Sequence, residues 1–360
     1  MTLDERAESI QERVHGHTTV EESGMTYTPE DREGLQAQGR GHLRSRHWQE
    51  ASAIFTRLIE QDEEDTDALI GLALVLDQSG QYDQMYRLAQ QATQLNPASA
   101  EALACKARAL QKLERLSEAT IANDQALLLD TNLALAWFNH SGQQLLQQRF
   151  PEALRYAERA IELDPTDPRS WTNKALAFAN MNRPFEALAA VDQALQEDPD
   201  HLLGLQVKGE ILRKYGRLPE IIETMHHALE IAPDDVTALR LIAYALRTRG
   251  EFEQLYEATA RLVELAPDEL FSWDCHMCAL RGLARFEEAR AAIDRVIELE
   301  PTNIRYLMIR ADNLLRLERY REAVLAAERA LQFDHEYEPA RRIHEKAARL
   351  MYQQKRKKKF

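Results

Sequence analysis

The sequence predicts an all-α repeat protein, and two observations support this fold class. The chain of 360 residues contains only 13 Gly and 12 Pro, while Ala, Leu, Glu, Gln and Arg dominate, a mixture that favours helix over sheet. In addition, one pattern of residues returns every 34 positions without insertion or deletion through most of the chain. A fixed period of this length indicates a repeat architecture.

Proline sets the phase of this repeat. It recurs at a spacing of 34 residues, or a multiple of that, at Pro97, Pro165, Pro199, Pro233, Pro267 and Pro301. A large apolar slot in the same phase holds tryptophan or leucine, as at Trp171, and a small residue such as Ala175 follows four places later. Alanine fills two further slots, for example Ala153 and Ala160. Small residues at fixed places let two helices approach closely, and proline ends the second helix.

This pattern resembles the tetratricopeptide repeat, whose large apolar, small, aromatic, alanine, alanine and proline positions are matched across roughly residues 32–337. The resemblance implies nine units, each made of two antiparallel helices A and B, stacked as a right-handed superhelical solenoid. Some units depart from the pattern, because Gln144 replaces a large residue late in helix A and Met277 takes the small slot. We expect local changes in packing there.

The two ends of the chain lie outside the repeats. Residues 1–31 carry eight acidic residues and two arginines, so we expect a partly flexible acidic arm. Residues 338–354 place apolar side chains such as Ile343 and Leu350 at helical spacing, which predicts a capping helix over the last repeat. Residues 355–360 form a basic tail, since positions 355–359 are all Lys or Arg.

The charge of the chain limits its partners. The formal net charge is −14 and the pI is ≈ 5.4, which argues against general affinity for nucleic acid or an anionic membrane. The basic tail is the exception: it is a weak, salt-sensitive contact for nucleic acid or acidic lipid, a localisation signal or a solubilising end. Three cysteines, no signal peptide and no long apolar stretch predict a cytoplasmic protein without membrane insertion.

One short segment has soft metal ligands. Cys275, His276 and Cys278 stand within four residues, but a structural zinc needs about four ligands and the sequence has no second CxxC. Neither a phosphate-binding loop nor a nucleophile elbow or metalloprotease motif is present. We therefore predict a non-enzymatic chain with no catalytic residues, no metal site and no cofactor.

Within the resemblance, the A helices line a concave groove, so the helix A slots that packing leaves free are candidates for a peptide site. Asn139 and Asn173 occupy the same slot one repeat apart, and stacked amides can hold the backbone of an extended peptide. Chance placement of two surface asparagines is the alternative. The neighbouring groove candidates are Leu135, Phe138, Arg169 and Leu176.

Arginines follow toward the C-terminal repeats. We predict that Arg213, Arg240, Arg247 and Arg281 face the groove and favour an acidic peptide, because guanidinium groups match carboxylates. The alternative is that these arginines pair with Glu210, Asp274 or Asp312. The Lys and Asn set of the carboxylate-clamp members of the family is not reproduced, so we do not expect a chaperone-tail clamp.

The predicted function is a protein-interaction scaffold or adaptor that holds a partner peptide in the groove. A structural subunit of a larger assembly, and a sensor that regulates an effector enzyme, are the alternatives. The identity of the partner does not follow from the fold, since one fold serves many functions.

Overall fold

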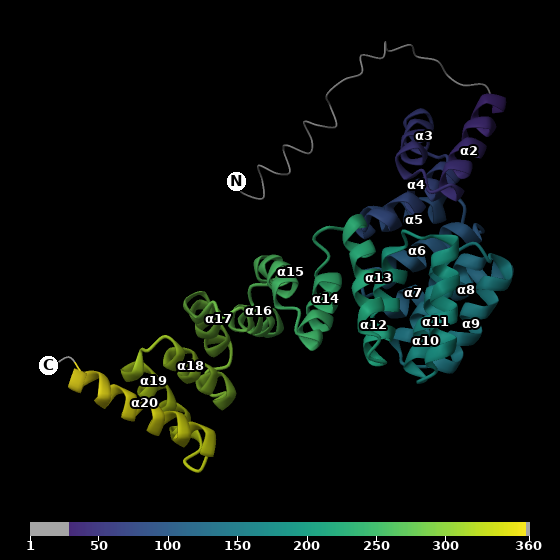
Figure 1. Ribbon diagram of the computed structural model, residues 1–360. Coiled ribbons are helices and arrows are strands. Elements are labelled where there is room, and N and C mark those ends of the chain that lie inside the picture. The colour runs from purple at the N-terminus through teal and green to yellow at the C-terminus, as the bar shows by residue number, and fades with distance from the viewer. Residues whose placement is uncertain (1–28, 358–360) are drawn as a thin grey trace, which may run out of the picture. The chain divides into compact units, whose positions relative to one another are not determined.

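The computed structural model describes residues 29–357, and every regular element in that range is an α-helix (Figure 1). The chain divides into two compact units, Met1–Thr131 and Asn132–Phe360, and we describe each by itself. Most of the acidic arm predicted for residues 1–31 lies outside the described residues. The first described helix begins at Pro29, three residues before the predicted start of the repeats.

The helices alternate in pairs. In the first unit they are α2 (Pro29–Arg44), α3 (Trp48–Gln61), α4 (Thr66–Ser79), α5 (Tyr82–Leu95), α6 (Ala100–Lys112) and α7 (Leu116–Leu129). In the second they are α8 (Ala134–Leu146), α9 (Phe150–Leu163), α10 (Pro168–Asn180), α11 (Pro184–Glu197), α12 (Leu202–Lys214), α13 (Leu218–Ile231), α14 (Val236–Arg249), α15 (Phe252–Leu265), α16 (Leu270–Gly282), α17 (Phe286–Leu299), α18 (Ile304–Arg316), α19 (Tyr320–Phe333) and α20 (Glu338–Lys357).

These elements confirm the predicted fold class. Across residues 29–357 there are nine helix pairs followed by α20. We call the even-numbered members α2 to α18 the A helices and the odd-numbered members α3 to α19 the B helices. Each A helix packs on its own B helix, and within each unit each B helix packs on the next A helix.

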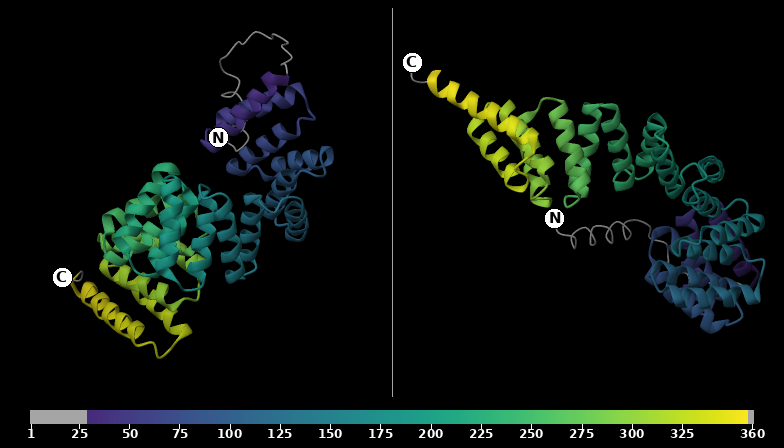
Figure 2. Two further views of the ribbon diagram at one scale, coloured as in Figure 1. Left: turned by 90° about the vertical axis from the view of Figure 1, so that its right-hand side faces the viewer. Right: turned by 90° about the horizontal axis from the view of Figure 1, so that it is seen from below.

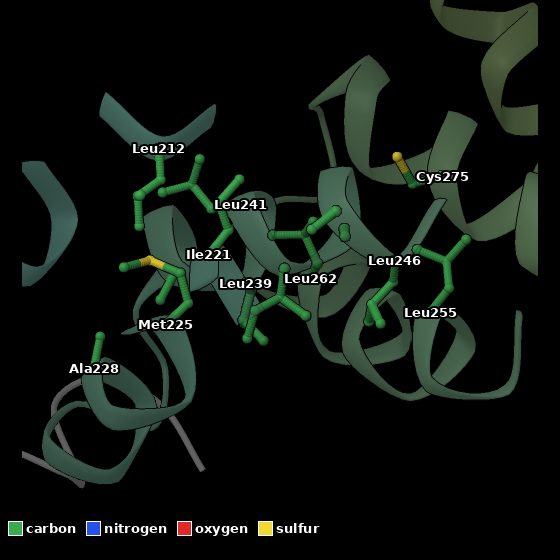
Figure 3. Packing of buried hydrophobic residues seen from close by; sticks show 14 of the residues in the cluster. Leu212, Ile221, Met225, Ala228, Leu239, Leu241, Leu246, Leu255, Leu262 and Cys275 are labelled. Atoms are coloured by element: carbon green, nitrogen blue, oxygen red, sulfur yellow. The ribbon is translucent and has the colours of Figure 1, made fainter. Parts of the chain in front are cut away.

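Buried alanine side chains let the paired helices pack closely together. Ala153 and Ala160 on α9 are 0% exposed, and each of these two slots, taken separately, holds a fully buried alanine in five of the eight other B helices that the structure describes. Larger apolar residues fill the space between the contacts. Figure 3 shows part of one such cluster, in which α12 to α16 contribute Leu212, Ile221, Met225, Ala228, Leu239, Leu241, Leu246, Leu255, Leu262 and Cys275.

Two glycines make room for one aromatic ring in the first unit. The ring of Phe55 on α3 is 1% exposed and lies against Gly39 of α2 and Gly71 of α4. A Cβ atom would lie 2.8 Å from Phe55 Cζ at Gly39 and 2.4 Å at Gly71. Both distances are too short for a carbon contact, so the first unit needs glycine on two helices to hold one phenylalanine.

The turn between helix A and helix B repeats one unusual backbone conformation. All nine of these turns in the described residues contain a residue with φ between 57° and 74°, at Arg46, Gly80, Glu114, Gln148, Asn182, Gly216, Gly250, Ala284 and Glu318. The following amide closes the turn: Arg285 N–H donates to the Leu280 carbonyl at 2.8 Å, the six-to-one bond of a Schellman motif. Left-handed backbone is costly for residues with a Cβ, so most of these turns carry strain.

We predict that Ala284→Gly raises the free energy of unfolding by about 0.5–1 kcal/mol, because the relief of left-handed strain exceeds the entropy cost of glycine. Gly250→Ala is the matched reverse change in the same slot. A Cβ there meets only Phe252 Cζ at 3.9 Å, so we expect a loss of similar size from strain alone. Urea unfolding followed by circular dichroism measures the free energy of unfolding of both variants. If both substitutions changed it in the same direction, the assignment of backbone strain to this turn position would be wrong.

Helix α20 covers the end of the second unit. Ala340 and Ala347 are 0% exposed, and Ile343 and Leu350 pack against the clusters formed by the preceding helices. In Figure 2 this last helix, drawn in yellow, lies alongside its neighbours. It continues to Lys357, so the first three residues of the predicted basic tail are helical.

Candidate functional site

All ten residues predicted for the site lie on A helices of the second unit, and three of them are buried. Phe138 is 4% exposed, Asn139 is 0% exposed and Asn173 is 8% exposed. Asn173 Nδ2 donates to the carbonyl of Phe138 at 3.5 Å, which joins α10 to α8. The slot shared by the two asparagines therefore lies inside the protein, and the same slot holds buried Val207, Leu241 and Cys275 on later helices.

Arg169 is held at the start of α10. Its Nε lies 2.9 Å from Asp167 Oδ1, and Asp167 caps the helix by accepting the Arg169 amide. The guanidinium also lies 4.8 Å from the centre of the Phe138 ring. Leu135 on α8 is half-buried. Each of these two residues is the second residue of its helix, and Arg169 has a structural partner there.

Arg240 forms one of the polar bonds that recur between neighbouring A helices. Its guanidinium lies 2.8 Å from Glu269 Oε1, at the residue that precedes α16. In the same slot, Gln206 donates to Asp235 at 2.7 Å, where Asp235 is the N-cap of α14. Each bond joins one A helix to the start of the next, so Arg240 contributes to the stacking of repeats.

Two aspartates are each shared by two arginines. Asp274 on α16 lies 2.8 Å from Arg247 of α14 and 3.4 Å from Arg305 of α18. The side chain of Asp274 is 10% exposed, that of Arg247 31% and that of Arg305 55%. The carboxylate is therefore well covered, and Arg305 is the partner that remains open to solvent.

The second shared carboxylate lies on α18. Asp312 Oδ2 is 2.6 Å from Arg281 of α16 and 3.2 Å from Arg316. The Arg316 side chain is 55% exposed and that of Arg281 is 26% exposed. Arg213 likewise pairs with Glu210 at 2.8 Å. The ion pairs that the sequence offered as an alternative to peptide binding are thus present for Arg213, Arg247 and Arg281.

Sharing leaves an excess of positive charge on these helices. The A helices α14, α16 and α18 contain seven arginines and two aspartates. Some arginines pair elsewhere, as Arg249 does with Glu251 and Arg310 with Asp294. The two shared carboxylates still face four guanidinium groups, so the arginines outnumber the aspartates that they contact here. Arg305 did not stand out in the sequence, because its approach to Asp274 depends on the helix crossing.

The Cys275 segment is part of the core. Cys275 is 0% exposed, and burial raises the pKa of its thiol to about 11. The thiol is packed within the apolar cluster that α12 to α16 form. His276 has a different environment: its Nδ1 lies 3.0 Å from Thr259 Oγ1, its ring stacks on Tyr256 at 5.3 Å and Trp273 packs edge-on. These contacts serve the packing of α16 on α15.

His276 also predicts a pH dependence. Burial lowers its pKa below the ordinary value, and the charge of Arg285 adds to that effect. The unfolded chain then binds a proton that the folded chain lacks, so stability is full above about pH 6.5 and declines as the pH falls through the folded pKa.

We expect this group to lower the free energy of unfolding by at most about 1.4 kcal/mol per pH unit as the pH falls below about 6.5 toward the folded pKa. His276→Gln removes the titrating group, so its stability should change less over this range. Urea titrations of both proteins at several pH values measure the two slopes. Identical slopes would show that His276 does not titrate differently on folding.

Comparisons with known proteins agree with this architecture. Residues 44–125 match the family described as anaphase-promoting complex, cyclosome, subunit 3, and residues 156–189 and 277–338 each match a family described as tetratricopeptide repeat. The crystal structure of the APC/C hetero-tetramer Cut9-Hcn1 is similar over 83% of this chain and 59% of that chain, at 15% identity and a TM-score of 0.53.

A second solved structure, of pilF from Pseudomonas aeruginosa, is similar over 59% of this chain and 96% of that chain, at 22% identity and a TM-score of 0.50. The search of curated proteins returned no match. The helix pairs, their period and these matches define an α-helical repeat protein. The chain is a tetratricopeptide-repeat protein. No helix among residues 29–357 is long and apolar enough to cross a membrane.

Proposed function

We propose that the protein is an interaction scaffold whose second unit binds an acidic segment of a partner protein along α14, α16 and α18. Repeat arrays of this kind present extended surfaces on which a partner makes many weak contacts. The observation that supports this assignment is the sharing of two aspartates among four arginines. An acidic partner would supply the carboxylates that this surface lacks.

The exposed arginines are the contacts that a ligand would reach first. Arg305 and Arg316 are each 55% exposed, whereas Arg247 and Arg281 are held closer to their aspartates. A guanidinium group has five N–H donors, so one loose ion pair leaves donors for a second carboxylate. Arg247 and Arg281 would position the aspartates, and Arg305 and Arg316 would contact the partner.

We predict that Arg305→Gln with Arg316→Gln weakens binding of a fluorescein-labelled deca-glutamate peptide by about 2- to 30-fold, since each exposed pair contributes about 0.2–1 kcal/mol. The affinity of the unchanged protein should also fall between about 0.05 M and about 0.3 M salt. Fluorescence anisotropy measures both effects.

Arg290→Gln with Arg329→Gln is the matched control, because these arginines are exposed on the B helices α17 and α19 of the same unit. This double variant has the same net charge as the test variant. If both variants lose affinity equally, the peptide responds to overall charge and the proposed surface is wrong.

The two alternative functions stay predictions. Assembly through the B helices has one observation in its favour: Phe185 on α11 is 83% exposed and Leu325 on α19 is 58% exposed. Exposed apolar side chains can mark protein interfaces, although single ones are common on any surface. Light scattering on the isolated chain would test self-association directly.

A further inference from the structure

A pocket opens between α10 and α12 of the second unit. Its volume is about 280 Å³, and its lining includes the apolar residues Leu176, Ala179, Val207 and Ile211 and the charged residues Glu210, Arg213 and Lys214. Two of these residues, Leu176 and Arg213, belong to the set predicted from the sequence. Val207 and Ile211 are 6% and 3% exposed. The pocket therefore has a buried apolar base, and exposed polar residues form its edge.

The size of the pocket indicates what kind of group it takes. Small-molecule and cofactor sites usually have volumes of about 300–1,000 Å³, so 280 Å³ lies at the lower limit. Leu176, Ala179, Val207 and Ile211 offer mainly aliphatic contacts. A single bulky apolar side chain fits this space and chemistry, whereas a nucleotide-sized cofactor does not.

The pocket depends on the residue in one slot of helix A. Glu210 holds this slot on α12, and Tyr244 holds it on α14. The Tyr244 ring lies 5.8 Å from the guanidinium of Arg213, so at the next step along the A helices a large ring occupies the corresponding position. Glu210 instead turns to Arg213, with Arg213 Nε donating to Glu210 Oε2 at 2.8 Å. The pocket beside Glu210 is therefore not filled by this side chain.

The edge of the pocket favours a negative group. Of the three charged lining residues, Glu210 is acidic and Arg213 and Lys214 are basic. Lys214 Nζ donates to the Ala179 carbonyl at 3.2 Å, which fixes the ammonium group near the end of α10. An ammonium group has three donors, so Lys214 keeps donors for a carboxylate of a ligand. Arg213 donates its Nε–H to Glu210, so its terminal N–H groups remain as donors for the same carboxylate.

We propose that this pocket takes one leucine-, methionine- or phenylalanine-sized side chain of the partner, with an adjoining aspartate or glutamate bound by Lys214 and Arg213. The inference rests on the proposed function, and it adds the residue pattern that anchors the partner. The arginines on α14, α16 and α18 then bind the acidic residues of the partner, while the pocket selects for an apolar residue.

Methyl-detected NMR of the full chain tests the assignment with defined peptides. The probe is acetyl-Gly-Asp-Leu-Asp-Gly-amide, and its comparators replace Leu by Ala or both Asp by Lys. We expect the first peptide to shift the methyl signals of Leu176, Val207 and Ile211. Each comparator should bind about 10-fold more weakly, because one loses apolar burial and the other reverses the charge.

One variant tests the apolar base of the pocket, and a second variant tests its basic edge. Ala179→Met fills the apolar space and should abolish the shifts at Val207 and Ile211. Lys214→Gln should weaken binding about 2- to 5-fold, and Lys346→Gln, an exposed change of the same charge on α20, should not. Circular dichroism confirms that each variant is folded.

The outcomes separate this inference from the proposed function. If the peptide moves signals on α14 to α18 but leaves the pocket methyl groups unchanged at millimolar concentration, the pocket assignment is wrong and the acidic-partner proposal stands. If the alanine comparator binds as well as the leucine peptide, the apolar selection is wrong. If neither region responds and deca-glutamate also fails to bind, both proposals fall.

Discussion

Close contact between paired helices is the constraint on which the rest of the structure depends. Alanines such as Ala153 and Ala160 have no exposed surface, and each lets a B helix approach the helices beside it. A larger residue in such a contact needs a compensating change, as Phe55 does with its two glycines. Most repeats have an alanine in at least one of these two slots. Within each unit, successive A helices therefore meet in a similar register, and their polar side chains come within bonding distance.

That register explains why the polar bonds of the second unit recur. Gln206 and Arg240 occupy one slot and bond to the start of the following A helix in the same way. Arg247 and Arg281 occupy another slot, and each bonds to an aspartate on the next A helix, although Asp274 and Asp312 stand in different slots. Hydrogen bonds and ion pairs of this type hold neighbouring repeats in line, and the arginines left over give the surface its charge. Stacking and the proposed partner binding therefore use the same residue type.

The sequence predicted the helix pairs well because the 34-residue phase places every apolar and small residue without a break. It predicted the site less well. Asn139 and Asn173 were assigned to the groove from their slot, but that slot faces the adjacent A helix and is buried. Whether a slot faces a neighbour or solvent depends on the crossing angle of the helices, which the period does not specify. The pocket was missed for a similar reason, since it arises from the side-chain directions of Glu210 and Tyr244.

The left-handed residue in each turn from helix A to helix B has a practical consequence. Glu114, Gln148 and Glu318 show that a long side chain is accepted in this slot, and all three are exposed. Cysteines introduced there would carry spectroscopic labels in a single backbone conformation, one label per repeat, outside the helix contacts. Distances between labels on successive turns would then measure how far each repeat shifts when a partner binds.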